Sequence, residues 1–282
     1  MPDTPMHPGS ESWASLRAQV MSQAAGLATP GPPGSGQCRT CRGPALGGYT
    51  RCFQCGLHAE SVPGSLADIV VPIGYAPKGG RLARQLWEYK SAEQAQAQAK
   101  ARARRWLRAL LLVFLHDHGP CVWRAATMPP PTHVAVVPSC RGRPGPHPLT
   151  TLIAPYLTLP WAGLVVATRD GPGGHHLDPG RFRAAGPLRG ATVLLLDDTW
   201  TSGGSAQGGA AALRAAGARH VAVLVLGRHL NQPRQPPAGA ASLGRPFRLD
   251  RCAVHEPGDE TLGAARRAGP HPLVATINRL DP

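Results

Sequence analysis

Two adjacent carboxylates close an apolar run and stand directly before a turn made of hydroxyls and glycines. The segment reads VLLLDDTWTSGGS, from Val193 to Ser205, and its acids are Asp197 and Asp198. Backbone amides at a helix N-terminus bind anions, and glycines let the main chain approach an anion closely. Carboxylates would repel a phosphate, but they accept hydrogen bonds from hydroxyls and supply oxygens to Mg²⁺. The segment therefore predicts a site for one molecule that carries both a phosphate and a diol, such as ribose 5-phosphate.

We expect the turn after the two acids to hold the phosphate through main-chain amides and hydroxyl groups. Its residues are Thr201, Ser202, Gly203, Gly204 and Ser205. Two other phosphate-binding motifs do not fit, because a Walker A loop needs a lysine here and a dinucleotide fingerprint carries its acid well after its glycines. The alternative is a strand that ends in polar residues, followed by a helix N-cap that binds no ligand.

Apolar runs alternate with turns and helical patterns in the second half of the chain. These runs occupy residues 133–139, 163–169, 191–198 and 219–228, and an earlier run occupies 68–76. They are continuously apolar, which is typical of parallel strands covered on both faces. After the third run, SAQGGAAALRAAG predicts a helix that ends at Gly217. The pattern predicts an α/β fold with a mostly parallel, twisted sheet flanked by helices, and ligands bind such sheets beyond the C-terminal strand ends.

The composition divides the chain into five parts. They are a disordered tail at 1–36, a cysteine-rich ribbon at 37–60, a helical segment at 61–130, the α/β core at 131–230, and a Pro- and Gly-rich C-terminal extension at 231–282. Within them, a helical pattern runs from Gly80 to His118 and is expected to stop at Gly119-Pro120. One more short strand is predicted in FRLDRCAVH, residues 247–255.

Four cysteines form two closely spaced pairs in the ribbon. They follow the pattern C-x₂-C-x₁₀-C-x₂-C and are Cys38, Cys41, Cys52 and Cys55. Such spacing can present four thiolates to one Zn²⁺ ion, and a Cys₄ site without an open coordination position is structural. Metal binding of this kind folds segments that are too short to bury a core. The alternative is four free thiols.

The other cysteines stand apart in the sequence. Cys121, Cys140 and Cys252 are each expected to pack rather than to do chemistry. His116 and His118 beside Cys121 have the composition of a metal site, but polar groups at a helix C-terminus explain these histidines with fewer assumptions.

The acidic turn resembles the phosphoribosyl pyrophosphate (PRPP) motif of type I phosphoribosyltransferases. In that motif apolar residues, two acids, two variable positions and a T-T-G-x-T-like turn hold the ribose 5-phosphate. The resemblance implies the type I phosphoribosyltransferase fold for the core. It also implies that Asp197 and Asp198 are the catalytic-site acids that contact the ribose hydroxyls, and that the turn binds the 5-phosphate. Ser202 and Ser205 replace the commoner threonines and keep the hydroxyl group.

Further segments resemble the ComF-like (competence protein F) branch of that superfamily, which carries a four-cysteine cluster before the transferase core. VVPSCRGRPG stands where the family binds pyrophosphate, LWEYK is similar to a KYKG-like segment, and residues 169–183 stand where a mobile lid is common. The implied pyrophosphate contacts are Ser139, Arg141, Arg143 and Lys90. The chain departs from the branch at GPHPL, which replaces an R-G-F-N-like stretch.

The resemblance implies a Mg²⁺-dependent phosphoribosyltransferase that binds PRPP and transfers the phosphoribosyl group to or from a nitrogenous acceptor. The ribbon would hold structural Zn²⁺. Two alternatives stay open, a PRPP-sensing protein without turnover and a DNA-binding protein that acts in DNA uptake. The net charge of +14 and the Arg-rich segment 100–108 are compatible with nucleic acid, an anionic membrane or phosphorylated substrates as partners, and equally with a solvated basic surface. The sequence does not identify the acceptor.

Membrane and secretory signals are not evident in the sequence. The longest apolar block, LRALLLVFL at 107–115, is too short to span a bilayer and contains Arg108. The first residues contain no apolar core of a signal peptide. We therefore expect a cytoplasmic location without a membrane partner, where reduced cysteines favour metal binding over disulfides.

Overall fold

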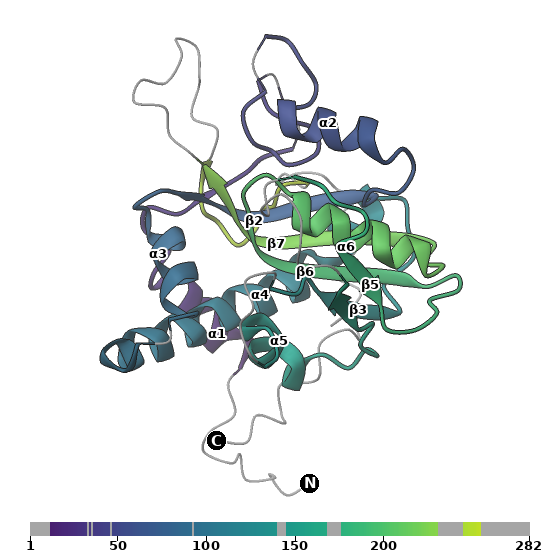
Figure 1. Ribbon diagram of the computed structural model, residues 1–282. Helices are drawn as coiled ribbons and strands as arrows, with labels where there is room; N and C mark the ends of the chain where they lie inside the picture. Colours follow the sequence, from purple (N-terminus) through teal and green to yellow (C-terminus); the bar gives the residue numbers. More distant parts are fainter. Residues whose placement is uncertain are drawn as a thin grey trace, which may run out of the picture.

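Four parallel strands form the central sheet, and helices cover both of its faces (Figure 1). The structure is a computed structural model that describes residues 12–32, 34, 36–45, 47–91, 93–139, 145–167, 176–230 and 245–254. The strand order is β2–β7–β6–β3. The bounds are Ile69–Pro77 for β2, His133–Val136 for β3, Thr192–Trp200 for β6 and His220–Leu230 for β7. The predicted α/β class with a mostly parallel sheet is confirmed.

The helices and short strands lie around this sheet. The helices are α1 Trp13–Met21, α2 Phe53–Ser61, α3 Arg81–Glu88, α4 Ala97–Ala125, α5 Pro148–Ile153 and α6 Gly204–Ala215, with 3₁₀ turns η1 Gln94–Gln96 and η2 Ala154–Tyr156. The short strands are β1 Ala28–Thr29, β4 Leu164–Val166, β5 Phe182–Ala184 and β8 Arg245–Pro246. In Figure 1, α6 covers one face of the sheet, and α4 covers the other together with α1 and α5.

Alternate residues of each strand enter two separate hydrophobic cores. In β6, Leu194 and Leu196 pack in the core that contains α4, whereas Val193 and Leu195 pack in the core that contains α6. Successive strand residues point to opposite faces, so a strand covered on both sides must be apolar at every position. The predicted end of α6 is also confirmed, because Gly217 follows the C-cap with a φ of +100°.

The expected disordered N-terminal tail contains a helix and a strand in residues 12–32. Leu16 and Val20, one turn apart in α1, are fully buried in the core that contains α4. Arg17 Nε donates a hydrogen bond to Asp117 Oδ2 at 3.0 Å. The prediction is wrong for this part of the tail because the apolar stripe of α1 gains its stability only from α4, which is distant in the sequence. The first part of the tail lies outside the described residues.

The predicted helix from Gly80 to His118 is two helices, and its predicted end is wrong. α3 ends at Glu88, and α4 continues through Gly119-Pro120 to Ala125. A proline inside a helix removes one main-chain donor and normally ends the helix. Here the residues that follow Pro120 are buried in the core, so tertiary packing outweighs the local preference.

The predicted strand at 163–169 does not extend the central sheet. Trp161 forms an isolated parallel bridge with Val134 of β3, and the chain then turns so that β4 pairs antiparallel with β5. Val165 in β4 is 39% exposed, so this strand has no helix over one of its faces. The residues beyond Ala167 in this run lie outside the described part of the chain.

The predicted strand at 247–255 is also wrong in its described part. Only Arg245 and Pro246 form a strand, β8, which pairs antiparallel with β1. Residues 247–254 are irregular, and their apolar side chains pack against the core that contains α4 instead of joining a sheet. The rest of the C-terminal extension lies outside the described residues.

Candidate functional site

The turn between β6 and α6 bends sharply into a helix N-terminus. β6 continues two residues beyond the acids to Trp200, and α6 begins at Gly204. Gly203 between them has a φ of +88°, a conformation that favours glycine. Its carbonyl accepts a hydrogen bond from Gln207 N at 2.9 Å, which closes the first helical turn. The positive end of the dipole of α6 therefore faces the turn that the sequence assigned to phosphate.

Both glycines of this turn are closely covered. A Cβ on Gly203 would lie 2.1 Å from Cζ2 of Trp200, and a Cβ on Gly204 would lie 2.6 Å from the carbonyl oxygen of His176. Any side chain at either position would therefore displace its neighbours. The close approach also places the main chain of His176 and Leu177, within the expected lid at 169–183, directly against the start of α6.

The three hydroxyl residues of the turn differ in exposure. Thr201 is exposed, Ser205 is half-buried and Ser202 is 9% exposed. Ser202 Oγ accepts a hydrogen bond from Gly204 N at 3.4 Å. Thr201 and Ser205 thus reach the surface around the helix N-terminus, whereas Ser202 supports the turn from within.

The two acids point to opposite faces of the sheet. Side chains alternate along a strand, so Asp198 shares a face with Leu196 and the core of α4, and Asp197 shares a face with Leu195 and the core of α6. From the sequence, both acids are expected to have the same role, which is to contact the ribose hydroxyls. In the structure each acid has its own surroundings.

Asp198 is 3% exposed and is held by three side chains from distant segments. Lys90 Nζ lies 2.6 Å from its Oδ2, Tyr89 donates its hydroxyl hydrogen to the same oxygen, and His147 Nε2 lies 3.5 Å away. Burial alone would raise the pKa of Asp198, but Lys90, His147 and Tyr89 together hold that pKa below its ordinary value. Asp198 is therefore a buried carboxylate whose negative charge is stabilised by these three neighbours.

Fewer groups stabilise the negative charge of Asp197. Its Oδ1 accepts a hydrogen bond from the main-chain N of Asp198 at 2.8 Å. Burial, followed by the negative charge of Asp198, raises the pKa of Asp197 to about 8. A carboxyl group in this condition is stabilised by any ligand that donates hydrogen bonds or brings a cation, which is typical of functional sites.

Among the residues implied by the resemblance as pyrophosphate contacts, Lys90 lies against the acidic turn. It follows α3 in the LWEYK segment and pairs with Asp198, so the structure brings this segment and the acids together. Ser139 lies half-buried three residues after β3. Arg141 and Arg143 lie outside the described residues.

Sequence reasoning missed His147, which belongs to the GPHPL stretch that departs from the ComF-like pattern. His147 is the N-cap of α5, and its Nδ1 accepts a hydrogen bond from Leu149 N at 3.2 Å. The neutral ring then carries its proton on Nε2, which faces Asp198. A polar residue before a proline at a helix start was visible in the sequence, but its contact with Asp198 was not.

Sequence reasoning also missed Arg228, in β7. It is 8% exposed, and its Nη1 lies 2.9 Å from the Thr201 carbonyl and 3.2 Å from the Trp200 carbonyl. On the other side, a Cβ on Gly43 would lie 2.6 Å from Arg228 Nη2. Arg228 therefore joins the acidic turn to the cysteine ribbon. An arginine at the end of an apolar run gives no sign of this in the sequence.

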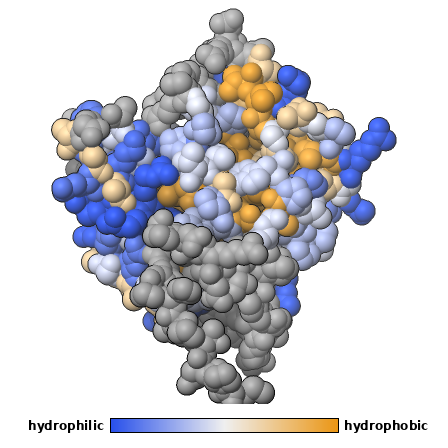
Figure 2. Space-filling view, turned by 90° about the horizontal axis from the view of Figure 1, so that it is seen from below, coloured by the Kyte–Doolittle hydropathy of each residue, from blue (hydrophilic) through white to orange (hydrophobic). Residues whose placement is uncertain are grey.

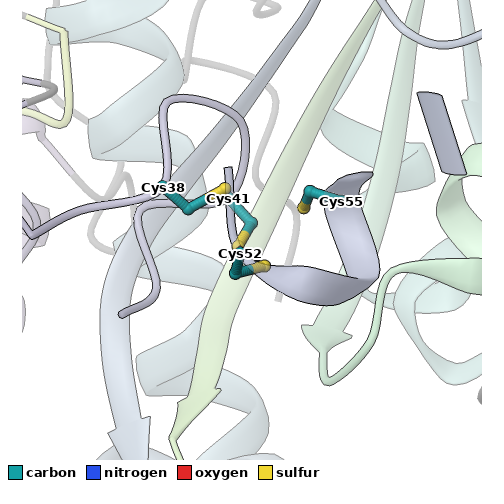
Figure 3. A group of neighbouring side chains, drawn as sticks. All are labelled: Cys38, Cys41, Cys52 and Cys55. Carbon is teal, nitrogen blue, oxygen red and sulfur yellow. Dashed lines mark hydrogen bonds between the residues drawn. The ribbon is translucent and has the colours of Figure 1, made fainter. Parts of the chain in front are cut away.

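The four ribbon cysteines converge on one point (Figure 3). Cys38 and Cys41 lie on a loop, Cys52 is the N-cap of α2, and Cys55 lies in its first turn. The Sγ atoms of Cys41 and Cys52 are 3.8 Å apart, which matches the edge of about 3.8 Å that Zn–S bonds of 2.3 Å give in a tetrahedral site. The cluster has the donor set and the spacing of a structural zinc site.

The ribbon rests on the C-terminal end of β2. Tyr75 donates its hydroxyl hydrogen to the Arg42 carbonyl at 2.6 Å. Arg42 has a φ of +58°, is 3% exposed and reaches Ala253 O with its Nε at 3.3 Å. Cys38, Cys41 and Cys55 are part of the same hydrophobic core as α6. The ribbon is thus packed onto the sheet beside the acidic turn.

Two of the cysteines that the sequence treats as isolated meet a histidine. His118, Cys121 and Cys252 offer ligand atoms that all lie within 4.8 Å of one another. The expectation that these residues serve packing alone did not foresee this cluster, because Cys252 comes from a distant segment. Cys140 lies outside the described residues.

Hydrophilic side chains gather on the left of the face drawn in Figure 2, on the side where α3 and the start of α4 lie in Figure 1. The exposed basic residues of α3 and of the first turns of α4 are Arg81, Arg84, Arg102 and Arg105, and Trp87 of α3 is 58% exposed. Within the described residues, the helices are too short or too polar to cross a bilayer.

Comparisons of the chain with profiles of protein families, with curated proteins and with solved structures gave no match in any of the three.

Proposed function

We propose that the turn between β6 and α6 binds the 5-phosphoribosyl group of PRPP and that the protein is a phosphoribosyltransferase acting on a nitrogenous acceptor. The observation that carries the proposal is the combination of a helix N-terminus, an obligatory glycine at Gly203 and two carboxylates that precede it in one strand. Main-chain amides suit a phosphate, and carboxylates suit the hydroxyls of its sugar.

The separate surroundings of the two acids suggest separate roles. Asp197 lies on the same face as α6 and carries a raised pKa, so it is the acid with most to gain from ribose hydroxyls. Asp198 forms an ion pair with Lys90. The side chain of Lys90 is 28% exposed, whereas that of Asp198 is buried. A diphosphate beside this pair would compete for the ammonium group of Lys90.

Mg²⁺ fits this site as part of the substrate. Among the described residues, the clusters of three or more His, Cys, Asp or Glu side chains that could hold a metal ion do not include Asp197 or Asp198. Mg²⁺ prefers to keep phosphate and water ligands and takes one or two protein carboxylates. We expect it to arrive on the diphosphate, where it neutralises the leaving group, with Asp197 as the available carboxylate.

The chain's contribution to the reaction is then positioning. The helix N-terminus fixes the phosphate, Asp197 orients the ribose, and the remote binding energy aligns the anomeric carbon with the incoming nitrogen. The acceptor supplies the nucleophile, so no side chain of the protein is needed in that role.

Calorimetry with PRPP and Mg²⁺ tests the proposal. Asp197→Asn is expected to weaken binding by at least about tenfold, because the amide cannot ionise to become the charged acceptor that ribose hydroxyls and Mg²⁺ stabilise, and the double change with Asp198→Asn by more. Asp250→Asn is the matched control, since Asp250 is a partly exposed acid that pairs with Arg248 away from the turn. Equal affinity in wild type and Asp197→Asn, or no binding by the wild type, would contradict the proposal.

The exposed arginines of α3 and α4 favour a second candidate, a DNA-binding protein. They stand beside an exposed tryptophan, Trp87, and such a surface can contact phosphates and stack a base. Replacement of Arg102 and Arg105 by glutamine should then weaken DNA binding and reduce its salt dependence, measured by fluorescence anisotropy. DNA affinity without any turnover of PRPP would favour this candidate over the enzyme.

A further inference from the structure

Three buried residues from distant parts of the chain form a compact cluster of metal-binding side chains. His118 and Cys121 lie three residues apart on one side of α4, and Cys252 comes from the C-terminal segment 245–254. One ligand atom of each lies within 4.8 Å of the others. The three residues are 3%, 1% and 1% exposed. The cluster is separate from the ribbon cysteines and from the acidic turn.

The ring of His118 is held in the tautomer that a metal ligand requires. Its Nε2 lies 3.0 Å from the Leu249 carbonyl oxygen, and because a carbonyl can only accept, Nε2 carries the hydrogen. In the neutral ring Nδ1 then keeps its lone pair, and it lies 3.7 Å from Cys121 Sγ. Histidines that bind metal commonly donate their other ring N–H to a main-chain carbonyl in this way.

The spacing also fits zinc. Zn–N bonds of 2.0–2.1 Å and Zn–S bonds of 2.3 Å at the tetrahedral angle place the N and S atoms about 3.6 Å apart. The 3.7 Å between His118 Nδ1 and Cys121 Sγ is close to this value. Two thiolates and one imidazole form a donor set that binds Zn²⁺ in preference to Mg²⁺ or Ca²⁺.

A metal ion here would act on a segment that has little secondary structure of its own. Within 245–254, only Arg245 and Pro246 are in a strand. Phe247 and Leu249 pack on the core of α4, and Arg42 of the ribbon bonds to Ala253. A metal link would join Cys252 to α4 across a long stretch of chain, and an ion that binds only the folded arrangement would stabilise that arrangement.

We propose that His118, Cys121 and Cys252 bind a second Zn²⁺ ion, which fixes the segment 245–254 to α4. Three protein ligands leave one tetrahedral position for a fourth donor. In the sequence, His255 follows Cys252 at the spacing that separates His118 from Cys121. His255 lies outside the described residues, and the proposal rests on the other three.

Metal analysis of the whole wild-type chain, purified under reducing conditions with zinc present, is the first test. We expect about two zinc ions per chain, one for each cluster. Cobalt substitution identifies the ligands without any mutation, since the Cys₄ site and the mixed histidine and cysteine site differ in their absorption bands. One zinc ion per chain, or a cobalt spectrum from tetrathiolate alone, would overturn the proposal.

Ligand substitutions are the second test. Cys121→Ser and Cys252→Ser should each lower the zinc content from about two ions to about one and leave the Cys₄ cobalt spectrum intact. Val122→Ala is the control, because Val122 is a buried neighbour on α4 that offers no ligand. Retention of both ions in either serine variant contradicts the proposal. A disulfide that joins Cys121 to Cys252, located by peptide mapping under non-reducing conditions, would also overturn it.

Discussion

The cysteine ribbon and the acidic turn are both short motifs, but they depend on the rest of the molecule to different degrees. The four ribbon thiols come from one continuous stretch, and their spacing alone places them around one point. The acidic turn also forms locally, yet the properties of its acids come from Lys90, Tyr89 and His147, which belong to other segments. A metal site can therefore be local, whereas the charge state of a buried carboxylate depends on tertiary contacts.

Arg228 makes this comparison testable because it contacts both regions. Its guanidinium group holds the carbonyls of the turn and packs against Gly43 of the ribbon. If the two regions are independent, damage to one should leave the other intact.

Loss of a ribbon ligand should have the largest effect. Cys55→Ser, or removal of zinc by a chelator, removes binding energy that is about 10–16 kcal/mol in zinc-finger peptides. We expect fast amide hydrogen exchange across residues 37–61, with continued protection of β6 and β7. Gln54→Ala in the same helix is the control. Protection of the ribbon without metal would show that packing on the sheet suffices to fold it.

Gly203→Ala tests the conformation of the turn. We expect the positive φ to lower the free energy of unfolding by about 1–2 kcal/mol, and the contact with Trp200 to lower it by a further ~1–3 kcal/mol. Urea unfolding measures the total loss. Gly190→Ala is the matched control, since Gly190 has a φ of +70° and nothing within 4 Å of the added Cβ. The difference between the two variants isolates the contact with Trp200. Equal losses in the free energy of unfolding would mean that the Trp200 indole does not lie against residue 203.

Arg228→Met separates the ribbon from the turn. It leaves the carbonyls of Trp200 and Thr201 without their buried donor, which costs about 1–3 kcal/mol. We expect weaker binding of PRPP and full zinc content in the variant, from calorimetry and metal analysis on the same sample. Loss of zinc would instead mean that the two regions are one cooperative unit.

Asp197→Asn should change the pH dependence of stability in a defined direction. The pKa of Asp197 is raised from 3.8 to about 8, so folding favours the protonated acid. The stability from this group is fully present below the ordinary value and is lost as the pH rises through about 8. The amide cannot ionise, and we expect the Tm of the variant to exceed that of wild type by about 2–4 °C or more at pH 9.

The control for this prediction is Asp250→Asn. Hydrogen bonding to Arg248 lowers the pKa of Asp250 to about 2, so that acid stays ionised throughout the range from about pH 6 to 9. Its variant should follow the wild-type curve. A curve for Asp197→Asn that also follows wild type would show that Asp197 is ionised in the folded protein.

The sequence determined the features whose cause is local. Continuously apolar runs gave the parallel strands, the glycine and hydroxyl pattern gave the turn and α6, and the C-x₂-C pairs gave the cysteine cluster, because each depends on backbone preference or on neighbours a few residues away. Where the competing contact was distant, the local pattern misled. α4 passes through Pro120, α1 forms in the expected tail, and the run at 163–169 leaves the central sheet.

Only the tertiary structure decided which side chains share a site. Asp198 meets Lys90 and His147, and Cys252 meets His118 and Cys121, through contacts between residues far apart in the chain. The periodicity of the sequence does not predict which of these residues meet. Their contacts follow from the packing of whole helices and strands, and the free energy of that packing comes from burying apolar surface over the whole elements.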